Sequence, residues 1–138
     1  MNTLASLLSW MISQLQGWPA ASNIQTLESE AFADDQFQFK VRADLQTSFK
    51  LQVRFYYNRG HVDYAYQLFR DTPVLRWDNK EDAGQLATAP HHFHDENDDI
   101  SESPLIGEPA HDWPMVKAAI ESHFGDREEP SRFDFVEL

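Results

Sequence analysis

The stretch FQFKVRADLQTSFKLQVRF, residues 37–55, decides the fold of this chain. Apolar and polar side chains alternate without a break in residues 37–43 and again in residues 49–55. A period of two puts every apolar side chain on one side of a strand, so each segment predicts a strand with one face in the core. The short link between the segments favours antiparallel pairing, because parallel strands need longer crossovers.

Further strands are predicted on both sides of this pair. A turn signal at 58–60 precedes a strand at 62–69, and a second turn signal at 71–73 precedes a short strand at 74–77. Residues 24–33 could form another strand at the start, although two glutamates interrupt their pattern. We therefore expect an antiparallel meander of four to five strands.

A helix is predicted at the start of the chain. Asn2 or Thr3 can cap it, and Gly17 and Pro19 end it. Its apolar stripe follows the helical period and consists of Leu4, Leu7, Leu8, Met11, Ile12 and Leu15. We expect this stripe to face the core rather than a membrane.

A second helix is predicted near the end of the chain. Asp112 is its expected N-cap, Pro114 lies in its first turn and Gly125 ends it. Its apolar stripe consists of Trp113, Val116, Ile120 and Phe124. Residues 126–138 would then be a flexible tail, a docking segment or an edge strand. The prediction is a single α+β domain over residues 1–138, in which the C-terminal helix packs on one sheet face.

Composition and charge exclude several classes of protein. The chain of 138 residues is 41% hydrophobic and contains no cysteine, so it can bury a core but cannot form a disulfide or a zinc–thiolate site. Residues 1–39 contain no Lys or Arg, which argues against a signal peptide and for a cytoplasmic location. A formal charge of −12 means that any RNA contact must use a local patch, or that the partner is basic.

Three histidines lie close together in a predicted loop that spans residues 78–110. In the run PHHFHD, residues 90–95, an extended backbone would point His92 and His94 to one side and His91 to the other. Two adjacent imidazoles can act as general base and acid, or they can bind a divalent metal. The alternative is that they are loop histidines bonded to backbone.

A metal site would need more ligands than two imidazoles. The candidates are Asp78, Asp95, Glu96 and His111.

The remaining candidates are Arg76 in the last predicted strand, Asp78 directly after it, and an acidic run. Asp78 either builds a turn or orients a histidine. Arg76 is either solvated or holds a phosphate. Residues 95–99 form a run of acidic side chains and one Asn, which reads as a solvated loop, a cation ligand or a surface for a basic partner.

Three motifs in order resemble the TumE-type toxin family of bacterial toxin–antitoxin systems. They are YAYQL at 64–68, WDN at 77–79 and PHHFH at 90–94, and the similarity covers residues 24–124. The resemblance implies a toxin whose partner is a cognate antitoxin, often of the helix-turn-helix type. This chain has Lys80-Glu81-Asp82-Ala83 where members commonly carry Ala-Pro-His-His, and Phe93 where they carry a basic residue.

The resemblance and the histidines lead to three functional hypotheses. The first is a toxin that cleaves RNA without metal, in which His92 and His94 act as base and acid, Asp78 orients one imidazole, and His91 or Arg76 stabilises the phosphorane. The second is a non-catalytic acidic module that binds a basic partner. The third is a metal-dependent hydrolase.

Overall fold

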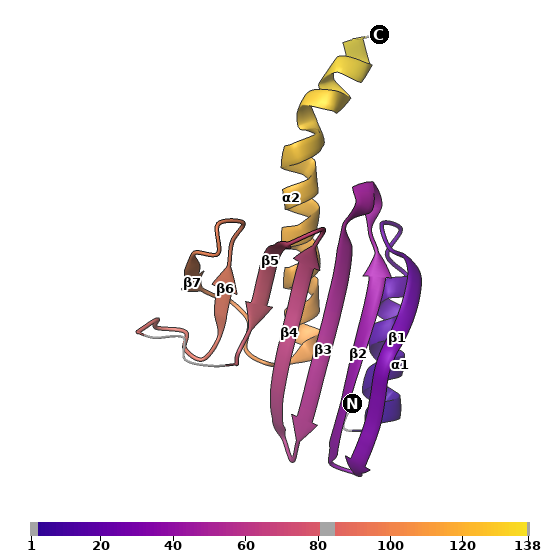
Figure 1. The fold of residues 1–138 in the computed structure, drawn as a ribbon, viewed down its shortest axis with the longest axis vertical. Helices are drawn as coiled ribbons and strands as arrows, with labels where there is room; N and C mark the ends of the chain where they lie inside the picture. The colour runs from indigo at the N-terminus through magenta and orange to yellow at the C-terminus, as the bar shows by residue number, and fades with distance from the viewer. Residues whose placement is uncertain (1–2, 81–84, 138) are drawn as a thin grey trace.

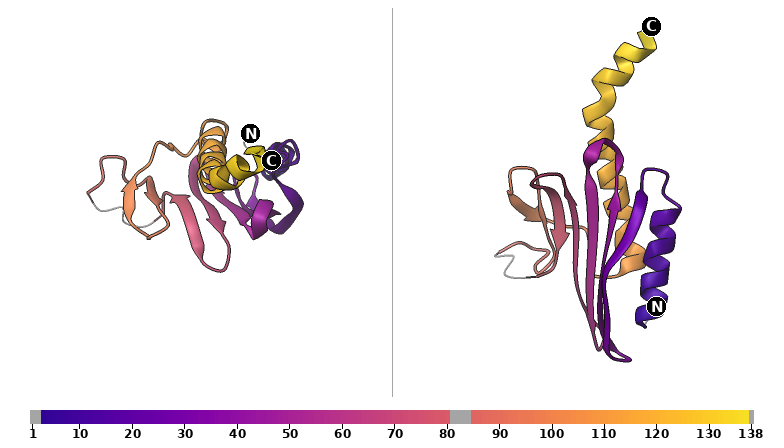
Figure 2. Two further views of the ribbon diagram at one scale, coloured as in Figure 1. Left: turned by 90° about the horizontal axis from the view of Figure 1, so that it is seen from above. Right: turned by 45° about the vertical axis from the view of Figure 1, so that its right-hand side comes forward.

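A computed structural model describes residues 3–80 and 85–137, and for Thr47 and residues 126–137 it describes the backbone alone. Within these residues the protein forms one antiparallel sheet of seven strands in sequence order, with both helices on the same face (Figures 1 and 2). The predicted α+β class is confirmed, as is the packing of the C-terminal helix on one sheet face. The predicted count of four to five strands was too low.

Five strands form the expected meander: β1 (Ser22–Ala33), β2 (Gln36–Asp44), β3 (Lys50–Asn58), β4 (His61–Phe69) and β5 (Pro73–Asp78). Alternate residues of β2 and β3 are buried, as a period of two requires. Arg59 and Gly60 connect β3 to β4 with φ angles of 52° and 91°. Two consecutive positive φ values match the twist of a tight hairpin, which explains why glycine is needed there.

The uncertain strand at 24–33 exists. It is β1, an edge strand of the sheet, and almost all of its residues are exposed. Glu28 is accommodated because its carboxylate reaches solvent and pairs with Lys40 of β2 at 2.9 Å.

The predicted loop at 78–110 contains two further strands, and this corrects the sequence analysis. Here β6 (His92–His94) pairs with β5, and β7 (Ile100–Glu102) pairs with β6. Each of these strands has three residues. An alternating pattern cannot be recognised over so short a span, which is why the histidine segment was read as a loop.

The helix α1 (Leu4–Gln16) matches the prediction. Thr3 is the N-cap, and its hydroxyl and that of Ser6 form a capping box. Leu7, Met11 and Leu15 of the predicted stripe are buried.

The helix α2 (Pro109–Glu137) is longer than predicted at both ends. Asp112 lies in its first turn rather than at the N-cap, and its buried carboxylate accepts the backbone N–H groups of Ile106 and Gly107 at 3.0 and 2.8 Å. The helix also continues through Gly125 to Glu137, so the edge strand considered for the tail is wrong for residues 126–137. A glycine inside a helix costs only about 1 kcal/mol, which does not force an end.

The core lies between the helices and the sheet. Trp18, at the end of α1, meets Trp113 of α2 edge to face, with ring centroids 5.6 Å apart, and Trp113 also stacks on Tyr66 of β4. All three side chains are buried. Among the described residues, no helix combines the length and the apolar character that crossing a membrane would need.

Candidate active site

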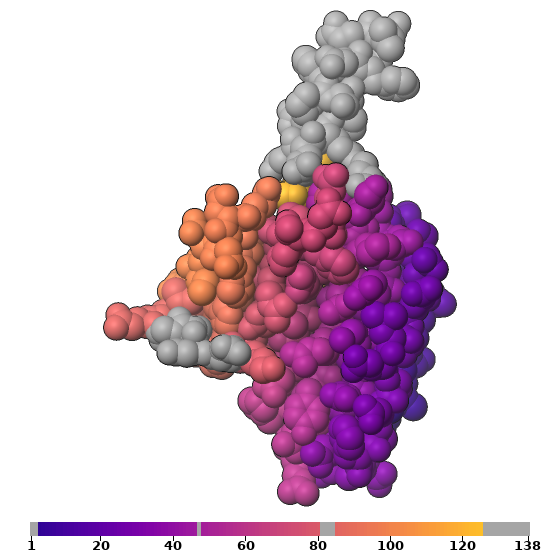
Figure 3. Space-filling view, in the orientation of Figure 1, coloured from indigo at the N-terminus to yellow at the C-terminus, as the bar shows by residue number. Residues whose placement is uncertain are grey.

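Figure 3 shows the face of the sheet opposite the helices, which we call the open face. The candidate site lies on this face, because its residues alternate along β5 and β6 with Trp77 and Phe93, which lie towards α2. Pairing of β5 with β6 sets Asp78 opposite His92 and Arg76 opposite His94. These four side chains line a pocket of about 350 Å³ together with Arg54, Lys80 and Ile100. The predicted residues Arg76, Asp78, His92 and His94 are thus brought together.

Asp78 is the centre of this cluster and is only 3% exposed. Its Oδ2 accepts the Nε–H of Arg76 at 2.6 Å, and its Oδ1 accepts the backbone N–H of Lys80 at 3.0 Å. The bond to Lys80 is the local turn considered from the sequence. The next residue, Asn79, anchors the end of β5 to β4, because its side chain accepts from Tyr64 N–H and donates to the Val62 carbonyl.

His92 is held between two acceptors. Its Nδ1 lies 2.9 Å from the carbonyl oxygen of Pro90, which can only accept, so Nδ1 carries the hydrogen. Its Nε2 lies 3.1 Å from Asp78 Oδ1. Both side chains are buried, so the imidazole ring and the carboxylate lie in close contact away from solvent.

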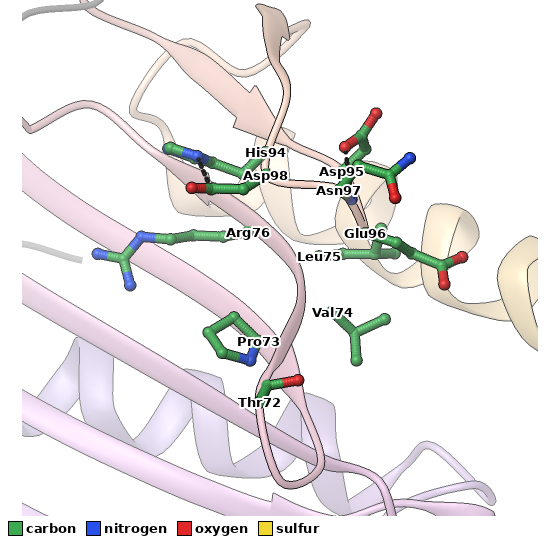
Figure 4. A pocket seen from close by; sticks show the side chains of 10 residues that line it. All are labelled: Thr72, Pro73, Val74, Leu75, Arg76, His94, Asp95, Glu96, Asn97 and Asp98. Atoms are coloured by element: carbon green, nitrogen blue, oxygen red, sulfur yellow. Dashed lines mark hydrogen bonds and ion pairs between the residues drawn. The ribbon is translucent and has the colours of Figure 1, made fainter.

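His94 has a different set of partners. Its Nδ1 donates to Asp98 Oδ1 at 2.9 Å, as the dashed line in Figure 4 shows. Its Nε2 lies 4.0 Å from Asp78 Oδ2, too far for a hydrogen bond, and its side chain is 20% exposed. Among the described residues His94 Nε2 has no hydrogen-bond partner, so in the neutral tautomer with the hydrogen on Nδ1 its lone pair would face the pocket, as a general base needs.

Asp98 was not singled out by the sequence analysis. It lies in the acidic run that connects β6 to β7 and adopts a left-handed φ of 62°. Asp95 stabilises the same turn by accepting the backbone N–H groups of Asn97 and Asp99 at 2.8 and 3.0 Å. The acidic run is thus partly used inside the protein, and its oxygens build the turn that brings Asp98 to His94.

A second pocket, of about 410 Å³, adjoins the first and shares Arg76 and His94 with it (Figure 4). Its walls are residues 72–76, from the start of β5, and residues 94–98, from the β6–β7 turn. Arg76 and His94 are therefore accessible from two sides, which leaves room for a ligand longer than one small group.

His91 lies apart from the cluster, as the alternation of an extended chain predicted. Its Nδ1 lies 2.9 Å from the hydroxyl of Tyr64, and the two rings stack. Burial raises the pKa of the Tyr64 hydroxyl, which therefore keeps its proton and donates it, while burial lowers the pKa of His91, which favours the neutral acceptor. The structure does not bring His91 to Asp78.

The sequence analysis did not propose Lys80 or Arg54 as site residues, yet both line the pocket. The sheet register runs Arg54, Ala65, Asp78, His92 across four neighbouring strands. Ala65 is small, so the guanidinium of Arg54 can reach over it towards the site. Within the described residues, no ion pair joins Arg54 or Lys80 to a carboxylate. The pocket therefore has a local excess of positive charge on a protein whose formal charge is −12.

The same cluster could also hold a metal ion. One ligand atom each from Asp78, His92 and His94 lie within 4.8 Å of one another, and this is the one such group among the described residues. The other predicted ligands are elsewhere: His111 bonds to Asp112, and Asp95 bonds to its own turn. Residues 81–83, where the chain departs from the family pattern, lie outside the described residues.

Comparison with known proteins places the chain in a family. The model of the family described as Toxin TumE matches residues 19–135. No curated protein and no solved structure matches the chain. The family match includes all of β1 to β7 and most of α2, and it contains the whole open-face cluster. The chain therefore belongs to the TumE toxin family.

Proposed function

We propose that this TumE-family toxin acts by cleaving RNA, and that the cluster of Asp78, His92 and His94 is the cleavage centre. The observation that carries the proposal is one pocket lined by two imidazoles in different environments, the carboxylate of Asp78 and three cationic side chains. These are the groups that transesterification of a ribose phosphate requires.

The proton transfers follow from the two histidine environments. His94 Nε2 has a free lone pair and is aligned by Asp98, so it takes the proton of the ribose 2′-hydroxyl. The 2′-oxygen then bonds to phosphorus. His92 carries a proton on Nε2 and gives it to the departing 5′-oxygen as the bond from phosphorus to that oxygen breaks. The products are a 2′,3′-cyclic phosphate and a 5′-hydroxyl, and the two imidazoles have exchanged protonation states.

Three cations account for the charge that develops on phosphate. Arg76 is fixed by Asp78 and by Gln67, whose Oε1 accepts from Nη1 at 2.6 Å. Arg54 and Lys80 approach the pocket from the other side of Asp78. Cationic donors held in place before the reaction stabilise a phosphorane without paying for reorganisation.

The cations of the pocket also explain how a protein with a formal charge of −12 could bind RNA. An acidic protein repels a polyanion at long range, and the contact must be made by a few cations at short range. Because only a few phosphates are contacted, RNA binding should weaken with salt along a shallow log–log slope, about 0.7 per phosphate contacted for single strands. The cytoplasm, where RNA is abundant, is the location that this function requires.

The experiment compares cleavage of two fluorescently labelled single-stranded oligonucleotides by the purified toxin. One is all RNA, and the other carries a 2′-deoxy sugar at each position. We expect cleavage of the first alone, with a cyclic phosphate end. His94→Ala should slow it by at least about 100-fold, the usual contribution of a positioned base. His61→Ala is the matched control, because His61 pairs with Asp63 on the exposed surface at 3.0 Å and lies outside the pocket.

Cleavage of the 2′-deoxy strand, or equal rates for wild type and His94→Ala, would contradict the proposal.

Because the family is one of toxins, a cognate antitoxin is the expected partner. We further propose that this antitoxin is a helix-turn-helix protein and that it is encoded beside the toxin. The acidic-module hypothesis is not needed to explain residues 95–99, since Asp95 and Asp98 are used within the site.

A further inference from the structure

The three groups at the centre of the pocket converge on one point. We propose that Asp78, His92 and His94 also bind a divalent ion of the zinc class, and that the bound ion switches the cleavage centre off. The binding site stands on geometry alone. The inhibitory effect rests on the proposed function, because it depends on both imidazoles being needed for proton transfer.

The hydrogen bonds outside the cluster orient both imidazoles as metal ligands are oriented. His92 donates from Nδ1 to the Pro90 carbonyl, and His94 donates from Nδ1 to the Asp98 carboxylate, each at 2.9 Å. Metal-binding histidines almost always donate their second ring N–H to such an acceptor, which directs the other nitrogen at the ion. Here the two Nε2 atoms lie 3.1 and 4.0 Å from oxygens of the same carboxylate, that of Asp78.

The distances between the ligand atoms suit a small ion. His92 Nε2 lies 3.1 Å from one oxygen of Asp78, and His94 Nε2 lies 4.0 Å from the other. Ligands about 2.0–2.1 Å from zinc in a tetrahedron are separated by about 3.4 Å. The three ligand atoms lie within 4.8 Å of one another, so side-chain movement towards a common centre would bring them to this separation.

Asp78 has a coordination position left for an ion. Each of its oxygens accepts one hydrogen bond, from Arg76 or from the backbone of Lys80, and each therefore has a second lone pair. The two imidazoles lie beside these oxygens, with their Nε2 atoms 3.1 and 4.0 Å away.

The ligand set and the surrounding charge select the kind of ion. Two imidazole nitrogens and one carboxylate suit zinc, cobalt or nickel, whereas magnesium and calcium prefer oxygen ligands. Arg54, Arg76 and Lys80 oppose any dication, so only an ion that bonds strongly to nitrogen can bind. Three protein ligands leave a fourth position for water, on the side of the pocket.

The bound ion should inhibit cleavage because it coordinates the Nε2 atoms of His92 and His94, which the proposed mechanism needs for proton transfer. His94 Nε2 is the proposed base and His92 Nε2 carries the proton of the proposed acid. Coordination to an ion occupies both nitrogens, so neither can accept nor deliver a proton while the ion is bound. A water molecule on the ion would not restore the cycle, because no free imidazole remains to protonate the 5′-oxygen.

The first experiment measures binding without RNA. Untagged, metal-free toxin is titrated with Zn²⁺ by calorimetry and with Co²⁺ by visible absorption, for wild type, His94→Ala and His94→Gln. We expect one ion per chain in wild type, tetrahedral cobalt bands, and a loss of affinity of at least about 10-fold in both variants, as for loss of a ligand or its support. Thermal unfolding of each variant confirms that it is folded.

His61→Ala is again the control, because it removes a histidine that also faces a carboxylate but has no second imidazole beside it. It should bind as wild type does. Absence of binding in wild type, or an affinity of both His94 variants equal to that of wild type, would overturn the metal site.

The second experiment adds Zn²⁺ to the RNA cleavage assay. We expect the cleavage rate to fall as zinc is added, with half of the inhibition at the zinc concentration that gives half-saturation in the binding titration. The rate should return when EDTA is added. Stimulation by zinc, or unchanged cleavage at saturating zinc, would overturn the inhibitory effect. If metal-free toxin cleaves no RNA, the proposed function fails and the switch falls with it, while the binding titration still decides the site.

Discussion

The two faces of the sheet use the same histidine run for opposite purposes. His92 and His94 lie on the open face, beside Asp78, among cations that belong to the pocket. His91, one residue earlier, bonds to Tyr64 and packs against its ring. The difference arises from the pleat, because neighbouring residues of an extended chain point to opposite sides.

Mutations on the two faces should have different effects on stability and cleavage. The helix-covered face consists of aromatic and aliphatic side chains in direct contact, so truncation there removes packing. The open face carries charged groups whose partners are one another. Changes on the open face should therefore affect cleavage first, and changes on the helix-covered face should affect stability first.

The largest effect is expected from Trp113→Ala on the helix-covered face. Trp113 is 1% exposed and contacts Trp18 and Tyr66. Truncation of a buried tryptophan should lower the free energy of unfolding by about 3–5 kcal/mol. Urea denaturation followed by circular dichroism measures this. Met115→Ala, on the same helix but 39% exposed, is the control and should stay within about 0.5 kcal/mol of wild type. Similar losses in both variants would contradict the assignment of the core.

Asp78→Asn tests the open face and should act mainly on cleavage. The amide keeps the size of the side chain but removes the counter-charge of His92 and Arg76. We expect a 10- to 100-fold fall in the cleavage rate, as is usual when a group that orients a functional histidine is changed. The rate at saturating RNA measures it, with circular dichroism as the check on folding. An unchanged rate would show that Asp78 only closes the turn to Lys80.

Arg54→Ala should have a smaller effect, confined to RNA binding. Loss of one cation from the pocket should raise KM about tenfold, which corresponds to ~1.4 kcal/mol, with little change in kcat. The salt dependence of binding should become shallower, by about one unit in the log–log slope. Arg59→Ala, in the β3–β4 turn, is the matched control. Equal KM values for the two variants would remove Arg54 from the RNA contact.

The smallest effect is expected from His91→Ala, and it is the most direct test of the comparison. The variant loses the hydrogen bond to Tyr64, which should cost about 1 kcal/mol of stability. Cleavage by the folded variant should change by less than about threefold. A loss of cleavage as large as that of His94→Ala would instead support the role at the phosphorane that was considered for His91 from the sequence.

Much of the fold could be predicted because it follows from local periods. Residues 37–43 and 49–55 became β2 and β3, and the stripe from Leu4 to Leu15 became α1. The prediction was wrong where the sequence pattern was too short to recognise, and where a residue that often ends a helix did not end it. β6 and β7 have three residues each, and Gly125 is a weak stop that the helix passes.

The candidate site was predicted only in part, for a related reason. His92, His94, Asp78 and Arg76 were singled out by type, and the alternation of an extended chain separated His91 from the other two histidines. Asp98 was hidden in an acidic run that looked like a solvated loop, and Arg54 was one of several strand arginines. Nothing local distinguishes either residue, because its role depends on a partner in another strand or turn.

The amino-acid sequence by itself determined which side of its strand each residue occupies. The alternation of polar and apolar residues is a local property, and it separated His91 from His92 and His94 before any pairing was known. Only the tertiary structure decided which strands are neighbours. Pairing of β5 with β6 places Asp78 against His92, and the register through β4 brings Arg54 to the same pocket. Register depends on contacts between residues far apart in the chain, and these arise only when the sheet forms.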